Sequence, residues 1–220
     1  MRILYIPFEL DEVGDLLKPL QKWQKRSRST NYIILTHKSN INIEKLGNNF
    51  EVFICAHGNY DEKDFVIENK ASDGRQLMIA DLASRFDHDF IFSSHKIKQV
   101  NLYFCGTEEK NSQIAQIFRK NLIRGTEYNI CYYHGNITIP DRMGLKWSKS
   151  IDKKVPIEQT GKMLFADDEI ILEHEKKYLI YKETKFHILF ENNKKTRNEK
   201  ITMCRKINHT TLSGSNMGYK

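Results

Sequence analysis

Two segments decide the expected fold: FEVFICAHG, residues 50–58, and VNLYFCG, residues 100–106. Each is a short apolar run, rich in aromatic and β-branched residues, that stops at a glycine, as a buried strand does. Residues 77–86, which lie between them, have the apolar spacing of a helix. A strand, a helix and a strand in this order predict a right-handed crossover and therefore a parallel strand pair.

The same periodicity extends the pattern in both directions. Further strands are expected over residues 2–8, 32–36 and 128–133, and further helices over 11–27 and 112–123. Beyond Pro140 the runs become shorter and are joined by turns. They are residues 163–166, 169–174, 177–182 and 186–190.

We therefore expect an α/β fold over residues 1–190, with a mainly parallel sheet that has helices on both faces. Its core would be residues 1–140, and a C-terminal antiparallel hairpin or flap would occupy residues 141–190. The polar, basic residues 191–220 are expected to be a partly disordered tail.

Composition narrows the function classes. The 220 residues carry a net charge of +7, which indicates either a solvated basic surface or attraction to a polyanion. No apolar run reaches the roughly 18 residues of a membrane span, and the acidic residues near the N-terminus argue against a signal peptide. The four cysteines form no CxxC pair, so we expect no metal site, and a reducing, cytosolic compartment.

The chemistry is expected where strands end, because ligands of a parallel sheet bind beyond the carboxyl ends of its strands. His57 and Cys105 directly follow the two defining strands, and each precedes a glycine. An imidazole beside a thiol generates a nucleophilic thiolate, and the glycines let a substrate approach the backbone closely.

The ordered motifs resemble a known family. They are FICAHGN (53–59), LMIADLASRF (77–86), LYFCGT (102–107), NSQIAQIFRKNL (111–122) and YNICYYHGNITIPDRMGLKW (128–147). Together they resemble the caspase, clostripain and legumain group of cysteine peptidases (clan CD). The nearest likeness is to the self-processing cysteine protease domain of RTX and clostridial glucosylating toxins.

This resemblance implies a peptidase in which Cys105 is the nucleophile, His57 is the general acid or base, and the N–H groups of Gly58 and Cys105 form the oxyanion hole. It further implies a peptide or protein substrate, including the chain itself, and allosteric activation by inositol hexakisphosphate in a basic pocket near the flap. Candidate polyanion ligands are basic residues of the first helix and five lysines: Lys162, Lys176, Lys177, Lys182 and Lys185. Phe104 stands where the family has glycine, which leaves its preference for cleavage after leucine open.

Several alternatives stay open. His134, which also ends an apolar run, is an alternative partner for Cys105, and Asp61 or Asp64 is a candidate to orient His57. The fold could instead be an inactive module that binds a protein or a polyanion, or the same residues could perform acyl transfer. The basic, aromatic residues 176–186 are interpreted as a strand rather than as a nucleic-acid contact. An active peptidase would suit a bacterial effector that is delivered into a host cytosol.

Overall fold

The computed structural model describes residues 1–27, 31–39, 47–58, 65–124, 127, 129–149 and 153–165. The chain divides into two units, Met1–Glu175 and Lys176–Lys220, and all described residues belong to the first. The predicted strands at 169–174, 177–182 and 186–190, and the tail, lie outside the described residues.

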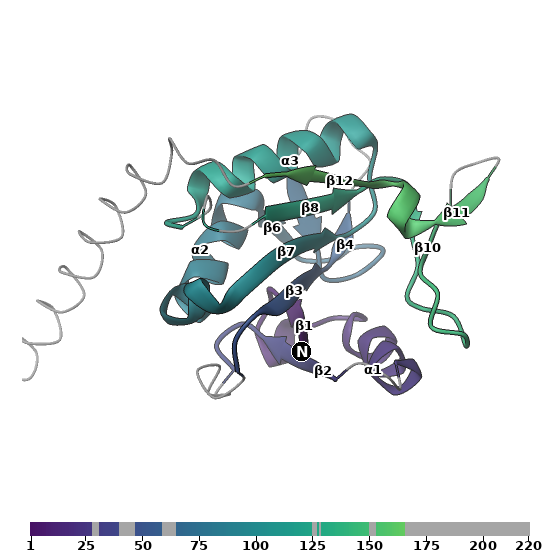
Figure 1. Ribbon diagram of the computed structural model, residues 1–220, viewed down its shortest axis with the longest axis horizontal. Coiled ribbons are helices and arrows are strands. Elements are labelled where there is room, and N and C mark those ends of the chain that lie inside the picture. The colour runs from purple at the N-terminus through teal and green to yellow at the C-terminus, as the bar shows by residue number, and fades with distance from the viewer. Residues whose placement is uncertain are drawn as a thin grey trace, which may run out of the picture. The chain divides into compact units, whose positions relative to one another are not determined.

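A six-stranded sheet forms the centre of the described unit, in the order β12-β8-β7-β3-β1-β2 (Figure 1). All neighbours are parallel except β12, which pairs antiparallel with β8. The mainly parallel sheet predicted from the sequence is therefore confirmed. The strands are β1 (Arg2–Ile6), β2 (Tyr32–Thr36), β3 (Phe50–Cys55), β7 (Ile97–Tyr103), β8 (Asn129–Tyr133) and β12 (Gly161–Leu164).

Three helices cover the sheet: α1 (Leu17–Arg26), α2 (Ile79–Phe90) and α3 (Glu108–Asn121). Trp23 of α1 packs its ring against Phe53, whereas Phe86 of α2 packs against Tyr5 and against Phe118 of α3. Leu4, the neighbour of Tyr5, is the register partner of Phe53, so Tyr5 and Phe53 point to opposite faces. The helices therefore lie on both faces of the sheet, as expected.

Two small sheets and several short 3-10 helices lie outside the central sheet, and the sequence pattern did not predict most of them. One sheet contains β4 (His57–Gly58), β5 (Val66–Glu68) and β6 (Gln76–Met78), and another contains β9 (Asn136–Ile137), β10 (Trp147–Lys149) and β11 (Lys154–Pro156). Short 3-10 helices occupy Leu10–Glu12, Ile91–Lys96 and Ile157–Gln159. Strands of two or three residues are too short to show a period of two.

The predicted starts of all three helices were wrong, and α3 begins at Glu108, four residues before the expected start at 112. The helix expected from residue 11 begins only at Leu17, because Gly14 has a φ of +60° that no helix accepts. The helix expected at 77–86 is preceded by β6 and continues to Phe90. Part of the expected flap, residues 141–165, contributes β10, β11 and β12, and β12 joins the central sheet instead of forming a separate hairpin.

Asp87 gives the fold a pH dependence. Its side chain is buried on α2, and one carboxylate oxygen accepts a 2.9 Å hydrogen bond from the N–H of Ile123. Burial outweighs this bond and raises the pKa of Asp87 to about 7 from an ordinary value of 3.8. Between these two values the folded chain holds more protons than the unfolded chain, so stability falls as the pH rises.

We expect Asp87→Asn to increase the free energy of unfolding at pH 8 and to leave it nearly unchanged at pH 4. Each unit of pKa shift removed corresponds to about 1.4 kcal/mol. Urea unfolding at the two pH values measures the effect, with Asp81→Asn, an exposed position on the same helix, as the matched control. An equal effect of Asp87→Asn at both pH values would contradict this assignment.

Candidate active site

The parallel pairing of β3 with β7 brings the segments that carry His57 and Cys105 together. Cys55 and Tyr103 are the last register partners of this ladder, and His57 and Cys105 each lie two residues beyond it. Gly58 lies directly on the Cys105 backbone, since a Cβ added at Gly58 would stand 1.7 Å from the carbonyl oxygen of Cys105. Only glycine allows the two strand ends to approach this closely.

An aspartate that the sequence pattern did not single out binds His57. Asp15 Oδ1 lies 2.6 Å from His57 Nε2. A carboxylate only accepts hydrogen bonds, so Nε2 carries the proton and Nδ1 is the basic ring nitrogen. Asp15 had been expected within a helix. The glycine in DEVGD, residues 11–15, was the one available sign that the backbone turns there.

A buried amide holds the turn that carries Asp15. Asn69 Nδ2 donates a 2.6 Å hydrogen bond to the carbonyl oxygen of Glu12, and the Asp15 N–H donates to the carbonyl oxygen of Asn69. The other Asp15 oxygen accepts from the N–H of Ala71 at 3.3 Å. Gly14 leaves no room for a side chain, because an added Cβ would stand 2.2 Å from the Asn69 oxygen. Asp15 is therefore held from both sides.

Strand β9 covers the sulfur of Cys105. The N–H of Ile137 donates to Sγ at 3.3 Å, and the thiol is 3.4 Å from the side-chain oxygen of Asn136. Burial raises the pKa of Cys105, and the hydrogen bond from Ile137 lowers it by less. The thiol is consequently protonated at neutral pH in this state.

A glycine pair fixes β9 over the cysteine. Gly106 and Gly135 form an antiparallel bridge, with N–H to oxygen distances of 3.3 and 2.8 Å. Asn111 supports the bridge from α3, because its Nδ2 donates to the carbonyl oxygens of Tyr133 and Phe104 at 2.7 and 3.4 Å. The Gly106 N–H is occupied by this bridge. The oxyanion donors that the family resemblance implies are the N–H groups of Gly58 and Cys105.

The other predicted residues lie elsewhere or outside the described residues. His134 Nδ1 is 3.7 Å from Glu108 at the start of α3, and the same carboxylate is 3.6 Å from Lys162. The contacts that the structure describes for His134 therefore place it toward α3, and Lys162 is in an ion pair. Six predicted residues lie outside the described residues: Asp61, Asp64, Lys176, Lys177, Lys182 and Lys185.

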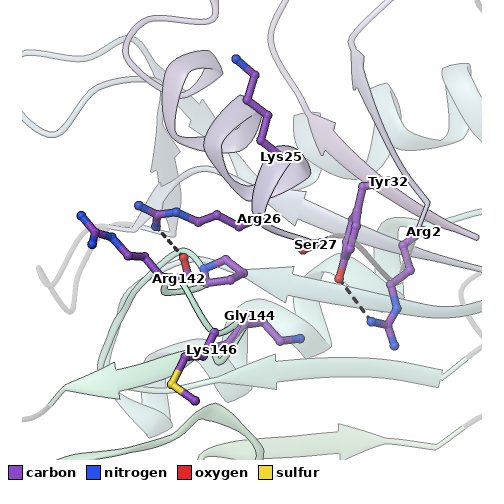
Figure 2. Close-up of a pocket in the computed structure, with 10 residues that line it drawn as sticks. Arg2, Lys25, Arg26, Ser27, Tyr32, Arg142, Gly144 and Lys146 are labelled. Atoms are coloured by element: carbon purple, nitrogen blue, oxygen red, sulfur yellow. Dashed lines mark hydrogen bonds between the residues drawn. The ribbon is translucent and has the colours of Figure 1, made fainter.

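A strongly basic pocket of about 740 Å³ lies between the end of α1, the starts of β1 and β2, and the loop at 140–146 (Figure 2). None of the described residues that line it is acidic, and Glu51, outside the lining, pairs with Arg2 at 2.9 Å. The lining cations are Arg2, Lys25, Arg26, Arg142 and Lys146. The basic residues of the first helix were predicted to contribute to such a site. Arg2, Arg142 and Lys146 were not, because they come from β1 and from the loop at 140–146, two segments far from the first helix in the sequence.

Lys146 is a half-buried cation of this pocket. Its ammonium group stands 4.9 Å from the ring centroid of Phe53 and 5.9 Å from that of Trp23. Burial, and then repulsion by Arg2, lower the pKa of Lys146. An anion that entered the pocket would offset this accumulation of positive charge.

Comparisons with family models, with curated proteins and with solved structures found no match for this chain. Of the helices that the structure describes, none has the length and apolar character to cross a membrane.

If Asp15 orients the His57 ring, we expect Asp15→Asn to slow alkylation of Cys105 by at least about tenfold. This is less than the roughly hundredfold or larger rate effect of a whole acid–base group. The amide keeps the shape of the side chain but loses the charge that stabilises the imidazolium. The rate of iodoacetamide labelling measures this effect, and urea unfolding checks the fold. Asp11→Asn, an exposed change on the same segment, should label at the wild-type rate, and so should Asp15→Asn if Asp15 has no such role.

Proposed function

We propose that this chain is a cysteine endopeptidase of the caspase-like class, with Cys105 as the nucleophile and His57 as its acid–base partner. The observation that carries the proposal is the contact of three segments: Gly58, the neighbour of His57, lies on the Cys105 backbone, and Asp15 binds Nε2 of the His57 imidazole. A carboxylate, an imidazole and a thiol in this order are the parts of a thiol-based acyl-transfer site.

The chemistry follows from the positions of these groups. His57 Nδ1 takes the thiol proton as Sγ of Cys105 attacks the peptide carbonyl carbon, and the N–H groups of Gly58 and Cys105 bind the resulting oxyanion. The imidazolium then gives its proton to the leaving amine, the C–N bond breaks, and a thioester forms. Water, deprotonated by His57, hydrolyses the thioester and restores the thiol.

The described state is a resting state in this proposal. The sulfur is covered by β9 and its pKa is raised, so a substrate carbonyl needs β9 to move. The segment from Asn136 to Lys146 provides a physical link, because its first residues touch Cys105 and its last residues line the basic pocket. Tyr103 OH, which donates to the carbonyl oxygen of Thr138 at 2.7 Å, ties the middle of this segment to β7.

We further propose that the basic pocket binds the activating polyanion, an inositol polyphosphate such as inositol hexakisphosphate. Five cations around one cavity match a ligand with several phosphate groups. Lys146 then gains a counter-ion and draws the 140–146 loop toward α1. Because the same segment continues to β9, this movement is transmitted to the residues over Cys105.

For the catalytic residues, we expect iodoacetamide to label Cys105 slowly at neutral pH and faster at alkaline pH, because its pKa is raised. Inositol hexakisphosphate should accelerate labelling at neutral pH and permit cleavage of the chain or of an added unfolded protein. His57→Ala should remove the acceleration, His134→Ala should retain it, and Cys105→Ala should abolish cleavage. Peptide mapping identifies the labelled thiol.

Labelling that depends on neither His57 nor the polyphosphate, without any cleavage, would contradict the peptidase and favour the alternative, an inactive module that binds a protein or a polyanion. A thioester that is passed to an amine rather than to water would indicate acyl transfer. Mass spectrometry of the products separates these outcomes.

For the pocket, we expect the double variant Lys25→Gln/Arg142→Gln to weaken binding of inositol hexakisphosphate by at least about tenfold, which corresponds to about 1.4 kcal/mol. Titration calorimetry measures the affinity. The matched control is Lys18→Gln/Lys22→Gln, which removes the same charge from exposed positions on α1 that do not line the pocket. Equal weakening by both pairs would mean that only the net charge attracts the ligand.

A further inference from the structure

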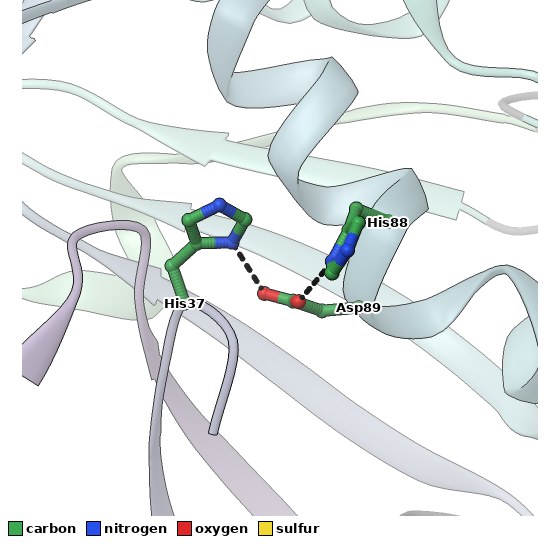
Figure 3. A group of neighbouring side chains, drawn as sticks. All are labelled: His37, His88 and Asp89. Carbon is green, nitrogen blue, oxygen red and sulfur yellow. Dashed lines mark hydrogen bonds and ion pairs between the residues drawn. The ribbon is translucent and has the colours of Figure 1, made fainter. Parts of the chain in front are cut away.

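A cluster of two histidines and an aspartate lies apart from both sites. His37 follows β2, and His88 and Asp89 lie in the last turn of α2 (Figure 3). One ligand atom from each residue lies within 4.8 Å of the others. Neither the proposed peptidase chemistry nor the basic pocket uses these side chains.

Asp89 is the centre of the cluster. One of its oxygens is 2.9 Å from His37 Nδ1, and the other is 2.8 Å from His88 Nδ1 (Figure 3). Tyr5 OH donates to the same carboxylate at 2.7 Å, and so does the Lys38 N–H at 3.3 Å. These contacts hold the carboxylate in a defined orientation.

The surroundings leave the cluster rigid on one side and accessible on the other. His37 and Asp89 have side chains that are 7% and 9% exposed, whereas that of His88 is 56% exposed. The His37 N–H donates to the carbonyl oxygens of both Ile6 and Phe8 at 3.0 Å, which fixes its backbone against β1. Two ligands are thus held in place, and the third can adjust from the solvent side.

We propose that His37, His88 and Asp89 form a binding site for a divalent metal ion of the zinc type. Two imidazoles and a carboxylate are the donor set that zinc and its neighbours among the first-row metals accept. Tetrahedral zinc binds nitrogen and oxygen at about 2.0–2.2 Å, which places two of its ligand atoms about 3.3–3.6 Å apart. The N···O separations of 2.8 and 2.9 Å are those of hydrogen bonds, so each imidazole moves away from Asp89 by several tenths of an ångström when the ion enters.

The ion takes the place of the two hydrogens between the imidazoles and Asp89. In each ring the proton moves from Nδ1 to Nε2, so the imidazole stays neutral and no co-reactant is required. The solvent side next to His88 admits the ion and leaves room for water ligands. Because His37 belongs to the end of β2 and the other two ligands belong to α2, the ion would tie the edge of the sheet to its covering helix.

The sequence predicted no metal site, since its criterion was closely spaced cysteine and histidine pairs. These ligands come from two distant segments. The rival interpretation is that Asp89 anchors Tyr5 and the two histidines through hydrogen bonds alone. That interpretation predicts no metal affinity at this position, which makes the two separable.

The experiment uses untagged full-length protein with Cys105→Ala, because a thiol beside His57 would also bind zinc. Zinc binding is measured by calorimetry and cobalt binding by visible absorption. We expect one site that gives a cobalt d–d spectrum, and a melting temperature that rises with zinc. His88→Gln should weaken zinc binding by at least about tenfold, as expected for the loss of one ligand.

His95→Gln, a change at another exposed histidine close by in the chain, is the matched control and should bind zinc as the parent does. His88 is exposed, so its variant should retain the fold, which circular dichroism verifies. Asp89→Asn is a second test, because the amide keeps the bulk but loses the anionic ligand. Zinc affinity and melting shift that are unchanged in both the His88 and the Asp89 variants would overturn the proposal, and so would an absence of binding by the parent.

Discussion

The parallel ladder between β3 and β7 is the constraint on which the rest of the arrangement depends. Its register, with Cys55 opposite Tyr103, determines which two residues meet when the strands end. The side chains of both strands are buried from Val52 onward and from Val100 onward, and a slip of one residue would turn each buried side chain to the other face. Core packing therefore enforces the meeting of His57 with Cys105, although neither residue belongs to the core.

Residues far apart in the sequence complete each of the three sites. Asp15 reaches His57 from a turn that Asn69 secures, and Lys146 reaches Arg2 from the loop that follows β9. His37 and Asp89 meet because β2 is the edge strand and α2 crosses the sheet next to Tyr5. In every case a backbone element brings together polar side chains from segments that are far apart in the sequence.

The sequence predicted the parts that depend on local periodicity. The strands around Ile33, Phe53 and Leu102, and the helical face with Leu20 and Trp23, appear where the apolar spacing placed them. Asp15 was missed because a contact between a turn and a strand end has no periodic signal, and the basic pocket was only partly anticipated for the same reason. Gly14 and Thr107 set helix boundaries through φ and through a capping bond, respectively, which apolar periodicity does not record.

The hydrogen bond from residue 137 to the Cys105 sulfur comes from the main chain. Every amino acid except proline supplies the same N–H group, so exchange of the Ile137 side chain leaves this restraint on the thiol intact. Natural variation at this position can therefore change the side chain beside the Cys105 thiol without removing this hydrogen bond. Two properties of residue 137 are thus separate: its main-chain N–H restrains the Cys105 sulfur, and its side chain shapes the surroundings of that sulfur.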